Sequence, residues 1–229
     1  MDYQFRFWHA LLNPSKLAFA LDNQETDYQI KGYRSRFFIL LGLTIVFFVL
    51  RAIWGMGTEN LTYLYATNLE EEYITSRYLA VLGAIIKGLL FFAFHYYFIT
   101  LCLSILTDYS FKAISKVQVF VIASILIEKA ILFLVYAVAG YTTPISFLSL
   151  GPISTYLTDE NFVVYFFNQL SIATIVTVLI QYMYLSKWED ESKGLLLAKI
   201  IAIQIFFALI TAGISVIPIY DYVSRVVGL

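Results

Sequence analysis

The stretch ILIEKAILFLVY, residues 125–136, places an acid, Glu128, beside a base, Lys129, in the middle of an otherwise apolar run. The whole chain is apolar: of its 229 residues, 60% are hydrophobic and only 14% are charged, and the mean hydropathy is +0.78. A soluble domain is about half apolar and about a quarter charged, so this chain has too few polar residues to cover a surface in water. We therefore predict an integral membrane protein, and the length suits one compact domain.

Five segments are long and apolar enough to cross a bilayer. A crossing helix needs about 20 mostly apolar residues to span a hydrocarbon core of about 30 Å. Inside lipid the segment must be helical, because no water is present to satisfy an open backbone. The predicted fold class is all-α, a polytopic membrane helix bundle with five transmembrane helices in a domain over residues 37–229. The predicted spans are residues 37–56, 78–106, 117–140, 162–185 and 195–220.

Lysine and arginine residues are distributed unevenly between the two ends of these spans. Such residues are enriched on the cytoplasmic side of membrane proteins. Ten of them lie on the side of the N-terminus and three lie on the other side. The ten are Arg6, Lys16, Lys31, Arg34, Arg36, Lys112, Lys116, Lys187, Lys193 and Lys199, and the three are Arg51, Arg77 and Arg225. We therefore expect the N-terminus inside the cell and the C-terminus outside.

The segment before the first predicted span, residues 1–36, is too short and too interrupted to cross. Phe5, Trp8 and Leu12 recur at helical spacing with polar residues on the other side. This pattern predicts an amphipathic helix lying in the membrane interface. Asn13 followed by Pro14 is typical of an N-cap and a first helical position, and it predicts a second short helix. The segment is either a lipid-surface anchor or a docking face for a partner, and the two roles can coexist.

The same segment carries a resemblance to a known family. It reads LLNPSKLAFAL over residues 11–21 and precedes five predicted spans that end outside, an arrangement that resembles the Yip (Ypt-interacting protein) membrane family. Bacterial members commonly open with a Pro-x-[Lys/Glu]-x-Phe segment, which Pro14, Lys16 and, one place late, Phe19 match here. The candidate interfacial and partner-binding residues are therefore Phe5, Trp8, Leu12, Pro14, Lys16 and Phe19.

The resemblance implies a non-enzymatic integral membrane protein that binds and organises other membrane proteins. One bacterial relative accompanies an ABC-type exporter, and eukaryotic relatives bind small GTPases on Golgi and ER membranes. The resemblance thus implies a location in the bacterial plasma membrane, with the eukaryotic ER or Golgi membrane as the alternative.

Polar residues of four predicted spans fall at similar depths near the middle of the membrane. At about 1.5 Å per helical residue, Glu128 and Lys129 lie about 17–18 Å from the inner face and Lys87 lies about 13–14 Å from the outer face. The full predicted cluster is Lys87, Glu128, Lys129, Asn168, Gln169 and Gln204. Charges at such depths normally face the bundle interior and pair. We expect Glu128 to pair with Lys87, and Lys129 to face Gln204, Asn168 or a watery cavity.

Three roles for this cluster remain open from the residues alone. It can hold the helices in register, it can form a relay or binding site for a proton, ion or substrate, or it can receive a span of another protein. Small-residue spacings at Ala84–Gly88 and Ala208–Ala212 predict close helix approach, either inside the bundle or between subunits of a homo-oligomer.

The residues that usually carry enzymatic chemistry are scarce. The chain has two histidines, His9 and His95, and one cysteine, Cys102, and it has no H-E-x-x-H motif. We therefore predict no metal site, no catalytic residues and no cofactor. The nucleotide-binding glycine motifs and a basic patch for nucleic acid are also absent from the sequence, so no nucleic-acid partner is expected.

The sequence favours two functions. The first is an accessory or scaffold protein, not an enzyme, whose partners are membrane lipids and other integral membrane proteins such as an ABC-type exporter. The alternative is a transport subunit or permease that moves a small solute or ion through a polar midplane site at Lys87, Glu128 and Lys129. No predicted span shows the Gly/Pro-broken pattern of many carrier sites, which favours the first function.

Overall fold

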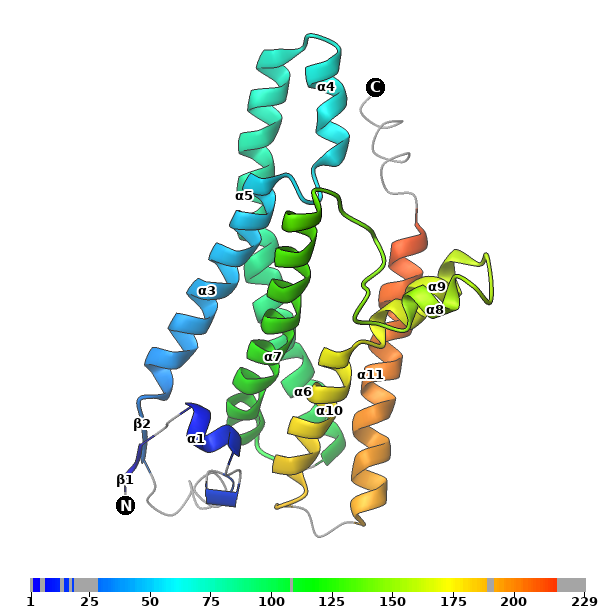
Figure 1. Cartoon of the computed structure of the whole chain (residues 1–229). Coiled ribbons are helices and arrows are strands. Elements are labelled where there is room, and N and C mark those ends of the chain that lie inside the picture. Colours follow the sequence, from blue (N-terminus) through cyan, green and yellow to red (C-terminus); the bar gives the residue numbers. More distant parts are fainter. Residues whose placement is uncertain are drawn as a thin grey trace.

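The computed structural model describes residues 2–4, 7–12, 15–16, 18, 29–107, 109–188 and 192–217 (Figure 1). Within these residues the protein is helical, apart from one parallel pair of three-residue strands, β1 (Asp2–Gln4) and β2 (Gln29–Lys31). The long helices run roughly side by side, with the amino-terminal elements at one end of the bundle. The predicted all-α class is thereby confirmed.

Four helices are long and apolar enough to cross a membrane, with mean hydropathies of 2.0 to 2.4. They correspond to the first, second, third and fifth predicted spans. They are α3 (Tyr33–Trp54), the continuous run of α5 (Glu70–Ala93), η3 (Phe94–Phe98) and α6 (Ile99–Thr107), α7 (Phe111–Ala139), and α11 (Lys193–Val216). The middle element of the second run, η3, is a π-helical turn. The shorter elements between them are η2 (Glu59–Leu61), α4 (Thr62–Ala66) and α8 (Gly151–Ser154).

The fourth predicted span, residues 162–185, is not one helix. It consists of α9 (Asn161–Gln169) and α10 (Ile172–Leu185), which run in different directions in Figure 1. With 14 residues, α10 is about 21 Å long, shorter than a hydrocarbon core of about 30 Å. The prediction of a continuous fourth transmembrane helix is therefore wrong.

The amino-terminal segment folds onto the bundle. Helix α1 (Phe7–Leu12) buries Ala10 completely, and the ring of Phe7 lies 4.9 Å from the ring of Phe120. The hydroxyl of Tyr184, at the end of α10, donates a hydrogen bond of 2.7 Å to the Ala10 carbonyl. One face of α1 thus belongs to the protein core.

The other predicted interfacial residues divide into two groups. Trp8 is 66% exposed and Lys16 is also exposed, so both remain available to lipid or to a partner. Phe5, Pro14, Phe19 and the side chain of Leu12 lie outside the described residues.

Helices α3 and α5 approach each other closely at the predicted small-residue spacing. Ala84 and Gly88 are buried against α3, and a Cβ atom built on Gly88 would lie only 3.2 Å from the Cα atom of Ile45. The small residues at positions 84 and 88 therefore allow close packing of α5 on α3 inside the bundle. A larger side chain at Gly88 would push the backbone of α3 away.

We expect Gly88→Leu to lower the stability of the protein by about 1–3 kcal/mol, the usual cost of overpacking. Gly83→Leu is the matched control, because it lies on the same helix and a Cβ atom there meets nothing within 4 Å. Thermal unfolding in detergent, followed by circular dichroism, measures both. Equal midpoints for the two variants would contradict the close approach.

Candidate functional site

The break between α9 and α10 is built from side chains and not from glycine or proline. Ser171 is extended, with φ −105° and ψ 175°, and it forms a reciprocal capping box with Thr174. The Ile172 amide donates to the Leu148 carbonyl at 3.1 Å, across the loop that precedes α8. A helix that starts inside a membrane domain must satisfy its first amides within the protein. The first and third amides of α10 are satisfied in this way.

Glu128 satisfies the second amide. Its Oε2 atom accepts a hydrogen bond of 2.5 Å from the backbone N–H of Ala173. A carboxylate at a helix N-terminus also interacts favourably with the helix dipole. Glu128 of α7 therefore holds the start of α10, a helix 45 residues further along the chain.

The expected ion pair between Glu128 and Lys87 is not formed. Lys87 is exposed on the surface of the bundle and makes no ion pair with another described residue. The depth of both residues along their helices is similar, but α5 turns Gly88 and Ala84 toward α3, and this rotation leaves Lys87 outside. The partner of Glu128 is instead the backbone amide of Ala173.

A polar cavity of about 520 Å³ lies beside this break. Its walls come from α3, α5, α7, α9, α10, α11, the π-helical turn η3 and the loop after α7. Five of the six residues of the predicted cluster line it, and Lys87 does not. The five are Glu128, Lys129, Asn168, Gln169 and Gln204.

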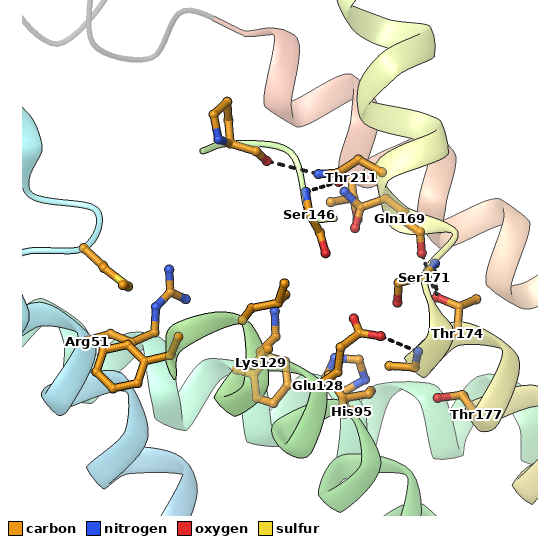
Figure 2. Close-up of a pocket in the computed structure, with 18 of the residues that line it drawn as sticks. Arg51, His95, Glu128, Lys129, Ser146, Gln169, Ser171, Thr174, Thr177 and Thr211 are labelled. Atoms are coloured by element: carbon orange, nitrogen blue, oxygen red, sulfur yellow. Dashed lines mark hydrogen bonds between the residues drawn. The ribbon is translucent and has the colours of Figure 1, made fainter. Parts of the chain in front are cut away.

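Arg51 is the most important cavity residue that the sequence did not predict. It lies in the last turn of α3, and the sequence offered only its isolation within an apolar run as a signal. Figure 2 shows Arg51 from α3 and Lys129 from α7 pointing into the same space. The ammonium of Lys129 lies 5.6 Å from the centre of the Phe91 ring, and the Arg51 guanidinium lies 6.0 Å from that of Phe47.

His95 also lines the cavity, because the π-helical turn Phe94–Phe98 carries it there. Its ring lies 4.6 Å from that of Phe91, and Figure 2 shows it next to Glu128. Single π-helical turns inside α-helices occur frequently at functional sites. The π-helical turn therefore brings the partly buried His95 to a wall of the cavity.

Asn168 has a structural role at this site. Its Oδ1 atom accepts from the Ser146 amide and from the Ser149 hydroxyl, both at 2.8 Å, and its Nδ2 atom donates to the Pro144 carbonyl at 3.1 Å. These three bonds use most of the capacity of its amide. Asn168 therefore fixes the loop after α7 to α9 and closes one wall of the cavity.

The inner wall of the cavity contains one buried hydroxyl without a partner. Thr177 is 4% exposed, it lines the cavity, and its hydroxyl has no hydrogen-bond partner among the described residues. Gln204, another lining residue, donates to the Oε1 atom of Gln181 at 3.3 Å. Leaving a buried polar group unsatisfied costs about 1–3 kcal/mol. The Thr177 hydroxyl is therefore suited to bind water or a polar solute.

The described residues contain no group of three or more histidine, cysteine, aspartate or glutamate side chains that could hold a metal ion. The cavity offers two cations, one carboxylate, one imidazole and several hydroxyl and amide groups. Such a set can bind a polar solute by charge and hydrogen bonds.

We expect Glu128→Leu to destabilise the start of α10 by about 1–3 kcal/mol, because it leaves the Ala173 amide buried without an acceptor. Glu128→Gln keeps an acceptor oxygen and loses only the charge–dipole term, about 0.3–1 kcal/mol. Hydrogen exchange at residues 172–174 measures the difference. Glu160→Leu is the control, because Glu160 is the N-cap of α9 and makes no side-chain capping bond. Unchanged exchange in Glu128→Leu would contradict the capping role.

Comparison of the chain with protein-family models, with curated proteins and with solved structures finds no match. The resemblance to the Yip family therefore stays a prediction from the short segment at residues 11–21.

Proposed function

We propose that the protein binds a small polar solute in the cavity beside the α9–α10 break and moves it across a membrane. One observation carries the proposal: the break between α9 and α10 and two cations, Arg51 and Lys129, lie at one polar cavity within apolar helices. Neither cation has an ion-pair partner among the described residues. Ionisable residues inside membrane segments mark pathways of ions and substrates. Discontinuous helices commonly form the binding sites of carriers.

A purely structural role of the charges has less support. Charges that only hold helices in register should pair with one another, because pairing lowers the cost of placing them in lipid. Here Glu128 bonds to a backbone amide, and Lys129 has no hydrogen bond or ion pair with another described residue. The charged groups of Arg51 and Lys129 thus remain available to a solute.

The sidedness belongs to the same proposal. The cavity extends toward the end of the bundle where α3 finishes, since Met56, Thr143 and Pro144 are among its lining residues. The distribution of lysine and arginine puts this end outside the cell. The solute would therefore enter or leave the cavity from the outer face of the membrane. The Yip resemblance favours a bacterial plasma membrane, with an ER or Golgi membrane as the alternative.

A second candidate function is the accessory protein that binds other membrane proteins, such as an ABC-type exporter or a second copy of this chain. The supporting observation is Lys87, which lies near the middle of the second long helix and is exposed where lipid would contact the bundle. A lysine facing hydrocarbon is costly, and an acidic residue on a partner's span would offset that cost. Partners recovered in fixed ratio in mild detergent, and lost in Lys87→Leu, would support this function.

Filling the cavity should stop transport without unfolding the protein. We expect Thr211→Trp to reduce solute flux at least tenfold, because Thr211 lines the cavity and, among the described residues, its hydroxyl donates to the Phe207 carbonyl alone. The flux would be measured with the purified protein in phosphatidylcholine vesicles, using radiolabelled carboxylic acids, amino acids, sugars and phosphate.

Ser215→Trp is the matched control for this experiment. Ser215 lies one turn further along α11, makes the same kind of backbone bond, to the Thr211 carbonyl at 2.8 Å, and is not a lining residue. Flux that is unaffected by Thr211→Trp, or absent for every solute in the wild-type protein, would reject transport through this cavity.

A further inference from the structure

We infer that the cavity selects an oxyanion, a small carboxylate or phosphate compound, and that Arg51 and Lys129 are the residues that bind it. The inference rests on the proposed function, because it names the class of solute for that same site. It depends on the charges at the cavity, on which of them already have partners, and on an unpartnered hydroxyl in the wall.

Arg51 presents a fixed positive charge to the cavity. A guanidinium stays protonated in proteins and carries five N–H donors in a planar fork that matches carboxylate and phosphate groups. In the described part of the chain these donors make no hydrogen bond and no ion pair. Glu59 attracts Arg51 from beyond ion-pair distance, but one oxygen of Glu59 already accepts from Gly57 and Thr142, at 2.9 and 2.8 Å.

Lys129 adds a second cation to the same space. Its ammonium lies over the Phe91 ring and makes no hydrogen bond with another described residue. The charges of Arg51 and Lys87 are close enough to repel it, whereas Glu128 attracts it. Two cations directed into one cavity raise its electrostatic potential, and a bound anion lowers that potential most effectively.

The carboxylate at the cavity offsets only one of these two positive charges. Glu128 is the only acidic residue among the described lining residues, and one of its oxygens is bonded to the Ala173 amide at the start of α10. A cation would need several oxygen ligands in one place. The cavity instead offers the donor groups of Arg51 and Lys129, and this set favours an anion.

Thr177 provides an independent indication of a ligand. The residue lines the cavity, and its buried hydroxyl has no partner among the described residues. A hydroxyl can donate to an oxygen of an anion or accept from a hydroxyl of a larger organic acid. The volume of about 520 Å³ falls within the usual range of about 300–1,000 Å³ for small-molecule sites, so an organic anion fits as well as phosphate.

The phosphate of a lipid headgroup has the same chemistry as a soluble phosphate. The experiment therefore uses the full-length protein in nanodiscs of phosphatidylcholine, with no anionic lipid, and measures the midpoint of thermal unfolding. Sodium phosphate and sodium citrate are compared with sodium chloride at equal ionic strength, and choline chloride and arginine hydrochloride provide the cationic probes. A second set of nanodiscs contains phosphatidylglycerol and no added oxyanion.

Phosphate or citrate should raise the midpoint in a saturable way, and the two cationic probes should not. A charge-assisted hydrogen bond contributes about 1.5–3 kcal/mol, so Arg51→Gln and Lys129→Gln should each raise the half-saturating concentration about 10–100-fold. Arg34→Gln and Lys112→Gln are the controls, since each removes an exposed cation from the same helix, α3 or α7, away from the cavity. They should leave that concentration unchanged.

A midpoint raised by phosphatidylglycerol alone, and lost in Arg51→Gln, identifies a lipid headgroup as the source of the anion. The inference is overturned if the cationic probes stabilise the protein and the oxyanions do not, if no probe acts beyond ionic strength, or if the control variants lose as much affinity as the cavity variants. If a cavity variant does not fold, the inference is tested by the wild-type protein alone, by comparing the shift of its unfolding midpoint with oxyanions and with the cationic probes. If an oxyanion binds but is not transported, the proposed transport is rejected and the inference of an oxyanion site stands. If uncharged solutes are transported and Arg51→Gln does not affect their flux, the proposed transport stands and the oxyanion site is rejected.

Discussion

The hydrogen bond from the Ala173 amide to Glu128 is the interaction on which the rest of the site depends. A helix cannot begin inside a membrane domain unless its first amides find acceptors. Glu128 supplies one, Ser171 supplies another and the Leu148 carbonyl supplies the third. Because α10 can begin there, α9 is free to lie at an angle to it, and both helices contribute to the walls of the cavity beside the break.

The same bond explains why the charges of α7 behave differently from a buried ion pair. Adjacent helical residues point about 100° apart, so Glu128 reaches α10 while Lys129 faces the cavity beside Arg51. Removing one member of a closed ion pair leaves an isolated charge, whereas here the carboxylate is satisfied by the backbone. The N–H donors of Arg51 and Lys129 thus remain available. The two cations repel each other, and an anionic solute bound between them would relieve this repulsion.

Hydropathy alone predicted most of the long helices, and it placed Glu128, Lys129, Asn168, Gln169 and Gln204 at one level, where the structure brings them together. It could not predict the rotation of a helix about its own axis, which leaves Lys87 outside. It also could not predict the break at Ser171, since the residues around the break are ordinary and one capping group comes from another helix. Arg51 was missed because its role depends on tertiary proximity to Lys129.

Helix α10 is anchored at both of its ends. The hydroxyl of Tyr184 bonds to the Ala10 carbonyl of α1, and its ring stacks on Phe120 at 5.6 Å between ring centres. Helix α10 is therefore the element that α1 and the cavity share. A substitution that moves α1 acts on the same helix whose first amides define the edge of the cavity, so contacts at the amino-terminal end of the bundle and the geometry of the site are not independent.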